Sequence, residues 1–265
     1  DLGVARSDVV IATKATGTMG PGPNDLGASR YHLLGQIDAS LERLGLDHVD
    51  LYQIHAWDPS TPMEETLRAL EDIVRSGRAR YVGVSNWAAW SMMKALGIAD
   101  RKGFDRIVSA QAYYTVAGRD LEREIVPLLE SEGLGLLVWS PLAGGLLSGK
   151  YRRTEGGAEG EGRRTAFSFP PVDLDRAWDV IDGMAAIAQA KGCSIASIAL
   201  AWLLHQKPVT SVIIGAKTPE QLGDNISACD VVLNAGELAE LDRLSALPSE
   251  YPGWMIQMQG QDLNR

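Results

Sequence analysis

The chain has 265 residues, of which 45% are hydrophobic and 22% are charged, and these proportions are typical of a folded globular domain. Its formal net charge of -9 argues against nucleic acid and anionic membranes as partners, although a small anionic ligand needs only a local basic pocket. No apolar run approaches the roughly 20 residues that a membrane-spanning helix requires.

Short runs rich in Val, Ile and Leu alternate with segments of helical periodicity, which is the pattern of a parallel sheet with crossover helices. The apolar runs lack a clean polar–apolar alternation, as expected for strands that are covered on both faces. The predicted strands are 8–14, 49–55, 80–85, 107–112, 134–140 and 209–214. The predicted helices are 33–44, 63–74, 88–99, 125–131, 177–191, 195–205, 219–228 and 236–246.

Two of these helices open on a Thr-Pro dipeptide. The sequences are Thr61-Pro62-Met63-Glu64 and Thr218-Pro219-Glu220-Gln221. A threonine side chain can accept a backbone hydrogen bond at a helix start, and proline suits the first helical position. Both helices are therefore predicted to begin at a threonine cap.

The remaining segments are irregular. Residues 152–173 are rich in glycine and charge and end in Pro170-Pro171, which predicts a mobile surface loop. Residues 247–265 are predicted to be a C-terminal tail. We expect a single barrel domain over residues 1–265.

Polar residues stand where the predicted strands end. Lys14 closes the run 9–14, and His55 closes the run 49–55. In a barrel of alternating strands and helices, the carboxyl ends of the strands carry the chemistry. A lysine and a histidine brought together there can hold a carbonyl group and move a proton. The pair is therefore a candidate for half of a catalytic centre.

The motifs that carry a family resemblance are, in chain order, IATK, LYQIH, GVSNW, SAQAYY, WSPLAGGLLSGKY and IIGAKTPEQLGDN. Together they resemble the aldo-keto reductase superfamily, and specifically its bacterial general-stress and oxidoreductase-like branch, over nearly all of residues 8–256. The resemblance implies an α/β fold, the (β/α)8 TIM barrel, and carbonyl reduction with a nicotinamide cofactor, usually NADPH. Since only six strands are predicted, we expect strands 3–8 and their helices, with the first two βα units missing.

The resemblance also implies catalytic roles. The family uses an Asp, a Tyr, a Lys and a His, and by matching motif Lys14 is that lysine and His55 is that histidine. The family's Asp and Tyr belong to its second strand and the following loop, which precede the lysine strand. We therefore expect an N-terminally truncated chain without its proton donor. It should be nearly inactive, because a general acid contributes roughly 10²–10⁴-fold in rate.

The cofactor residues are likewise implied by the resemblance. Ser85, Asn86 and Gln111 match the residues that hold the nicotinamide carboxamide, and Trp139 matches the ring that stacks on the nicotinamide. A cation at a helix N-terminus suits the 2′-phosphate of NADPH. The residues that match the pyrophosphate, 2′-phosphate and adenine contacts are Ser140, Leu142, Gly144, Gly215, Lys217, Thr218, Gln221 and Asn225.

Other interpretations stay open. Ser85-Asn86 can be only the cap of the next helix, and Trp57 and Trp87 can either line the substrate pocket or pack under loops. A non-catalytic NADPH-binding module, similar to the channel-associated auxiliary subunits of the family, is one alternative function. A lyase in which Lys14 forms a Schiff base is another.

The expected partner is a small carbonyl compound. Whether it is an aldehyde, ketone, sugar or quinone is not distinguished by these residues, nor is the oligomeric state. The histidines show no metal-ligand spacing, so no metal site is predicted. Because two cysteines form no disulfide framework, we expect a reducing, cytoplasmic location.

Overall fold

The computed structural model describes residues 3–154, 157–159, 164 and 167–263. Its residues group into two compact units, which are treated separately below. Unit 1 takes in Asp1–Ala112 and Leu128–Leu137, and unit 2 takes in Tyr113–Pro127 and Val138–Arg265. The prediction of one barrel domain over residues 1–265 stays a prediction.

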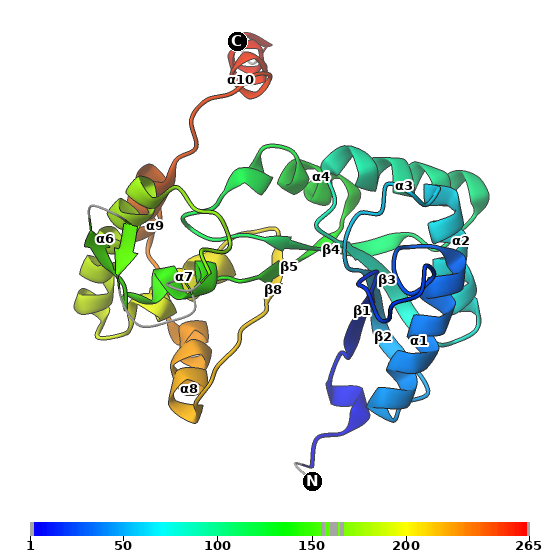
Figure 1. Cartoon of the computed structure of the whole chain (residues 1–265). Coiled ribbons are helices and arrows are strands. Elements are labelled where there is room, and N and C mark those ends of the chain that lie inside the picture. The colour runs from blue at the N-terminus through cyan, green and yellow to red at the C-terminus, as the bar shows by residue number, and fades with distance from the viewer. Residues whose placement is uncertain (1–2, 155–156, 160–163, 165–166, 264–265) are drawn as a thin grey trace. The chain divides into compact units, whose positions relative to one another are not determined.

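The α/β pattern is confirmed, with a six-stranded sheet in the order β1-β2-β3-β4-β5-β8 (Figure 1). The elements up to the fifth strand are β1 (Ala12–Ala15), α1 (Arg30–Leu44), β2 (Val49–Ile54), α2 (Met63–Arg75), β3 (Ala79–Ser85), α3 (Ala89–Lys102), β4 (Ile107–Tyr113), α4 (Ile125–Glu132) and β5 (Gly135–Trp139). Those that follow are β6 (Arg152–Thr154), β7 (Gly157–Glu159), α6 (Leu174–Lys191), α7 (Ile195–Leu204), β8 (Val209–Val212), α8 (Pro219–Ser227), α9 (Ala235–Ser245) and α10 (Gly253–Leu263).

Within unit 1, strands β1 to β4 pair in parallel, each with the next in the chain. Successive residues of a strand point to opposite faces of the sheet. Tyr52 points to the helical face, because its hydroxyl donates a hydrogen bond to the carbonyl oxygen of Leu33 on α1 at 3.1 Å. Gln53 and His55 therefore belong to the opposite face of β2, which turns away from α1.

Two strand boundaries differ from prediction by more than one residue. The strand predicted at 8–14 begins only at Ala12, because the residues before it bond the Asp50 side chain instead of a neighbouring strand. The Asp50 carboxylate accepts a hydrogen bond from the Ile11 amide at 2.7 Å and forms an ion pair with Arg6 at 2.7 Å. The strand predicted at 209–214 ends at Val212, although the amide of Ile213 still donates to the carbonyl oxygen of Val138 at 2.8 Å.

The two predicted threonine caps have different outcomes. At α8 the prediction is confirmed, because the Thr218 side chain accepts the Gln221 amide at 3.3 Å and Pro219 is the first helical residue. At α2 it is wrong, because Pro62 itself is the N-cap and makes no side-chain cap bond. The Thr61 hydroxyl instead donates a hydrogen bond to the Asp58 carboxylate at 2.7 Å.

The segment predicted as a mobile loop, 152–173, falls partly outside the described residues, which omit 155–156, 160–163 and 165–166. Its described part contains β6 and β7, which pair antiparallel. The segment predicted to be a C-terminal tail, 247–265, contains the helix α10. That helix starts at Gly253 and contains Gly260, so it gives no strong helical signal in the sequence.

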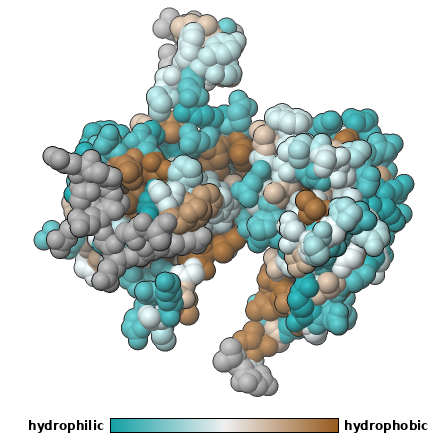
Figure 2. Space-filling view, viewed as in Figure 1, coloured by the Kyte–Doolittle hydropathy of each residue, from teal (hydrophilic) through white to brown (hydrophobic). Residues whose placement is uncertain are grey.

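Strands β1 and β8 stand at the two ends of the strand order. Apolar side chains are exposed beside them, among them Val9, Val10 and Ile213. Figure 2 shows the corresponding apolar surface on the N-terminal segment. A sheet edge presents unpaired backbone donors and acceptors, so both strands could accept further pairing.

No single helix among the described residues has both the length and the apolar character to cross a membrane, and only α6 and α7 taken together do, across a bend of 99°.

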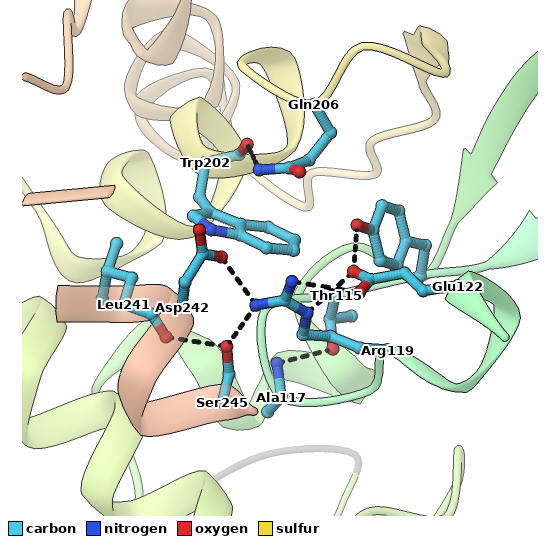
Figure 3. A network of polar contacts seen from close by, with 10 residues as sticks. Thr115, Ala117, Arg119, Glu122, Trp202, Gln206, Leu241, Asp242 and Ser245 are labelled. Atoms are coloured by element: carbon cyan, nitrogen blue, oxygen red, sulfur yellow. Dashed lines mark hydrogen bonds and ion pairs between the residues drawn. The ribbon is translucent and has the colours of Figure 1, made fainter. Parts of the chain in front are cut away.

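In unit 2, Arg119 joins the chain after β4 to α7 and α9 (Figure 3). Its guanidinium donates to Glu122 at 2.7 and 3.0 Å, to Asp242 at 2.7 Å and to Ser245 at 2.8 Å. It also lies over the ring of the fully buried Trp202, 5.1 Å from the centroid. Several charge-assisted bonds converge on one largely buried group, so this contact should contribute strongly to the stability of unit 2.

We expect Arg119→Met to lower the free energy of unfolding by about 2–4 kcal/mol, because it removes the charged donor that Glu122, Asp242 and Ser245 share in a largely buried site. Urea denaturation followed by tryptophan fluorescence measures the effect. Arg243→Met is the matched control, since it breaks an exposed Arg243–Glu240 pair that should contribute about 0–1 kcal/mol. Equal losses in both variants would contradict the assigned importance of Arg119.

Candidate functional site

Lys14 and His55 lie at neighbouring strand ends in unit 1. Lys14 is on β1 in register with Gln53 of β2, and His55 follows the last residue of β2. The backbone amide of His55 donates to the Ala15 carbonyl oxygen at 2.8 Å and to Thr16 Oγ1 at 3.0 Å. The end of β2 is thereby tied to the end of β1, and the predicted pair is brought together.

The two side chains also interact electrostatically. Burial lowers the pKa of Lys14 below its usual value. Burial first, and then the positive charge of Lys14, lowers the pKa of His55. A neutral histidine can donate a hydrogen bond to a carbonyl oxygen without a charge of its own, so His55 is suited to orient such a group at neutral pH.

Ser85, Asn86 and Gln111 are also brought together in unit 1. Ser85 is in register with Gln111, and both are buried. Asn86 has a left-handed backbone with φ of 57°, and its amide donates to the Gln111 carbonyl oxygen at 3.0 Å. Its side-chain nitrogen donates to Ser85 Oγ at 3.1 Å and to the His55 carbonyl oxygen at 3.4 Å. Amide and hydroxyl groups therefore lie beside His55 at the strand ends.

Trp57 and Trp87 belong to an aromatic cluster that also includes Trp90. The Trp57 ring packs edge-on against Trp87, with centroids 4.9 Å apart, and against Trp90 at 5.6 Å. Trp87 is buried, whereas Trp90 is exposed. Trp90 was not among the sequence candidates, because nothing in GVSNWAAW distinguishes a surface tryptophan from one that packs on a neighbour.

A cavity of about 1080 Å³ opens in unit 2. Four segments of the chain line it: the end of β5 with the turn that follows, Phe169, the start of α7, and the stretch from β8 into α8. Its lining includes the predicted cofactor residues Trp139, Ser140, Leu142, Gly144, Gly215, Lys217, Gln221 and Asn225. Thr218 is not among the lining residues and caps α8 instead.

The turn after β5 is built from left-handed residues. Ser140, Ala143, Gly144 and Gly145 have φ of 51°, 50°, 67° and 93°. A Cβ at Gly144 would lie 2.5 Å from the carbonyl oxygen of Phe169, so only glycine fits there. The backbone amides of Gly144 and Gly145 are used within the turn itself. Gly144 N–H donates to Ser140 Oγ at 3.1 Å, and Gly145 N–H to the Leu142 carbonyl oxygen at 2.8 Å.

The start of α8 arranges the other side of the cavity. The Lys217 amide donates to Gln221 Oε1 at 2.9 Å, and the Lys217 side chain is exposed. Asn225 is buried, and its side-chain nitrogen donates to the Gly215 carbonyl oxygen at 3.5 Å. Gln221 and Asn225 therefore hold the loop that carries Lys217.

Sequence reasoning missed several cavity residues. Lys150 lines the cavity, with its ammonium 5.3 Å from the centre of the Tyr151 ring. Phe169 stacks on Trp139, with centroids 5.8 Å apart. The Gly-Lys-Tyr that closes WSPLAGGLLSGKY could have indicated Lys150, but nothing local indicates Phe169, which lies 30 positions away in the chain from Trp139.

No group of three or more His, Cys, Asp or Glu side chains suited to a metal ion occurs among the residues that the structure describes. Both cysteines are free thiols.

Comparison with known proteins identifies relatives over most of the chain. The sequence profile of the Aldo/keto reductase family matches residues 2–246. A probable voltage-gated potassium channel subunit beta of Arabidopsis thaliana is 39% identical over 237 residues, covering 88% of this chain and 71% of the relative. An uncharacterized oxidoreductase of Bacillus subtilis (strain 168) is 37% identical, covering 88% and 70%. An L-glyceraldehyde 3-phosphate reductase of Escherichia coli O157:H7 is 34% identical, covering 92% and 71%.

We expect Lys14→Met to raise the pKa of His55, because it removes the positive charge that disfavours the imidazolium. NMR titration of the histidine Cε1–H signals measures it, and His55→Gln assigns the signal. Lys94→Met, on the surface of α3, is the matched control and should leave His55 unchanged. An unchanged or lower His55 pKa in Lys14→Met would contradict the coupling.

Proposed function

The chain belongs to the aldo/keto reductase family, whose members act on small carbonyl compounds and generally use NAD(P)H, and on this premise we propose that it is an NADPH-dependent reductase of aldehydes or ketones. The observation that carries the proposal is the coupling of Lys14 and His55 at adjoining strand ends. The relatives described as an oxidoreductase and a reductase support the same class of reaction.

In this proposal, His55 orients the substrate. Its lowered pKa favours the neutral imidazole, which donates one hydrogen bond to the carbonyl oxygen. Lys14 stands beside it and, by the family resemblance, lowers the pKa of a tyrosine that delivers the proton. Trp57 and the exposed Trp90 can contribute apolar surface for the carbon skeleton of the substrate.

Bound NADPH would supply the hydride. The lining of the unit 2 cavity fits such a group in its chemistry, with an aromatic ring at Trp139 and the cations Lys150 and Lys217. Lys217 precedes the N-terminus of α8, where a helix dipole and a cation together favour a phosphate. We therefore assign the 2′-phosphate to Lys217, beside the Thr218 cap of α8.

In this proposal, residues 1–265 do not supply the proton donor of the catalytic group. The resemblance locates the family's Asp and Tyr on elements before the lysine strand, so the sequence as given should turn over very slowly. The exposed Val9 and Val10 beside β1 support further pairing at that edge of the sheet.

The second candidate is a non-catalytic NADPH-binding module of the same family. The similarity to a protein described as a probable potassium channel subunit beta favours it. The two candidates differ in turnover but share the cofactor, and a cytoplasmic location remains a prediction for both.

We expect Lys217→Met to weaken NADPH binding by roughly tenfold and NADH binding much less, because only NADPH carries the 2′-phosphate that the cation would neutralise. Titration of the fluorescence of each bound nucleotide measures both affinities. Lys94→Met again serves as the surface control. Equal weakening of both nucleotides, or of neither, would contradict the assignment of Lys217.

The reductase proposal is tested by measuring reduction of a reactive aldehyde, 4-nitrobenzaldehyde, with NADPH. We compare the sequence as given with a chain extended by the residues that its coding DNA specifies upstream. The extended chain should be at least roughly 10²-fold faster, because it gains the general acid. Lys14→Met in the extended chain should abolish turnover and leave NADPH binding largely intact. NADPH binding without turnover in the extended chain would instead favour the binding module.

A further inference from the structure

Gln53 occupies a core position with a polar side chain. It lies in the middle of the parallel part of the sheet, on β2, and is 0% exposed. Both of its side-chain polar atoms are buried without a hydrogen-bond partner in the described part of the molecule. A buried amide without partners destabilises the fold relative to an apolar side chain, so we expect this glutamine to have partners in the working protein.

The sheet register identifies the residues beside it. Lys14 of β1, Gln53 of β2 and Gly83 of β3 are successive register partners, and Gly83 is paired in turn with Ser109 of β4. Residues in register on parallel strands point to the same face, about 4.8 Å apart. The four residues therefore form one row across the face that turns away from α1.

Gly83 allows the row to be compact. A Cβ at this position would lie 2.6 Å from Ser109 Oγ and 3.4 Å from Gln53 Cγ, so both side chains lean over the glycine from either side. Ser109 Oγ is itself buried and without a hydrogen-bond partner in the described residues. Two unpartnered polar side chains thus flank the same point on β3.

Lys14 completes the row as a cation that burial destabilises. No hydrogen bond or ion pair of Lys14 is found among the described residues, and its charge acts on His55, two residues beyond Gln53 on the same face of β2. The other described side chains on this face near it, Gln53, Ser85, Ser109 and Gln111, are uncharged. The helix α1 lies on the opposite face, and the charge of Lys14 lowers the pKa of His55, the titratable group at the end of β2.

We propose that Gln53 is a positioning residue for Lys14, with its side-chain oxygen accepting a hydrogen bond from the lysine ammonium and its side-chain nitrogen donating to Ser109 Oγ. This arrangement gives partners to all three groups in the row. An acceptor beside an ammonium favours the charged form, so Gln53 keeps Lys14 protonated against the effect of burial. The proposal rests on the proposed function, in which a charged Lys14 lowers the pKa of the proton donor.

The test measures the acid dissociation constant of Lys14 by trace acetylation with acetic anhydride across pH, quantified by mass spectrometry of the Lys14 peptide. The full chain is used, and Lys94 and Lys102 serve as internal references. In Gln53→Leu, the constant should rise roughly tenfold, because a hydrogen bond to a charged group is lost. Ser109→Ala should move it in the same direction by less. Gln53→Glu should move it in the opposite direction, because a carboxylate favours the ammonium.

Gln206→Leu is the matched control, since the Gln206 side-chain nitrogen donates to the Trp202 carbonyl oxygen within unit 2. The same Lys14 constant in Gln53→Leu as in Gln206→Leu would overturn the proposal. If circular dichroism shows that Gln53→Leu does not fold, the other two variants decide. An unchanged acid dissociation constant of Lys14 in both Gln53→Glu and Ser109→Ala would then overturn the proposal. NADPH titration of the same proteins tests the proposed function separately. The Lys14 measurement needs neither cofactor nor turnover, so an unchanged Lys14 constant counts against the role of Gln53 and not against NADPH binding.

Discussion

The parallel register of β1 to β4 is the constraint on which the candidate catalytic residues depend. Because Lys14 pairs with Gln53, the chain leaves β1 and β2 at the same level, and His55 follows at once. The amide of His55 then bonds Ala15 and Thr16, which fixes the two strand ends to one another. A shift of one residue in this pairing would turn every side chain of a strand to the other face and separate the pair.

Burial lowers the pKa values of the two residues that this register brings together. The charge of Lys14 lowers the pKa of His55, and Lys14 is itself partly buried, whereas His55 is exposed. The same partial burial would be costly for a permanently charged site. The uncharged side chains of Gln53 and Ser109 share a register row with the partly buried Lys14, and an acceptor there would favour its charged form.

In unit 2, hydrogen bonds of the turn after β5 and of the start of α8 shape the walls of the cavity. The turn after β5 is held by its own backbone bonds and by left-handed residues, so Ser140 and Gly144 form a rigid wall. On the other side, Gln221 and Asn225 bond the backbone before α8 and present Lys217. Elsewhere in the unit, the bonds of Arg119 hold the chain after β4 against α7 and α9. A preformed wall reduces the ordering cost of binding a flexible ligand.

The sequence by itself determined the alternation of strands and helices, the threonine cap of α8 and the family, because apolar periodicity, Thr-Pro openings and ordered motifs are local signals. It also identified Lys14 and His55 as strand-end residues. Tertiary structure alone decided which groups meet. The start of β1 depends on a carboxylate 39 residues away, Asp50. The stacking of Phe169 on Trp139 and the row from Lys14 to Ser109 likewise join segments that no local pattern relates, since long-range pairing and burial are properties of the folded sheet.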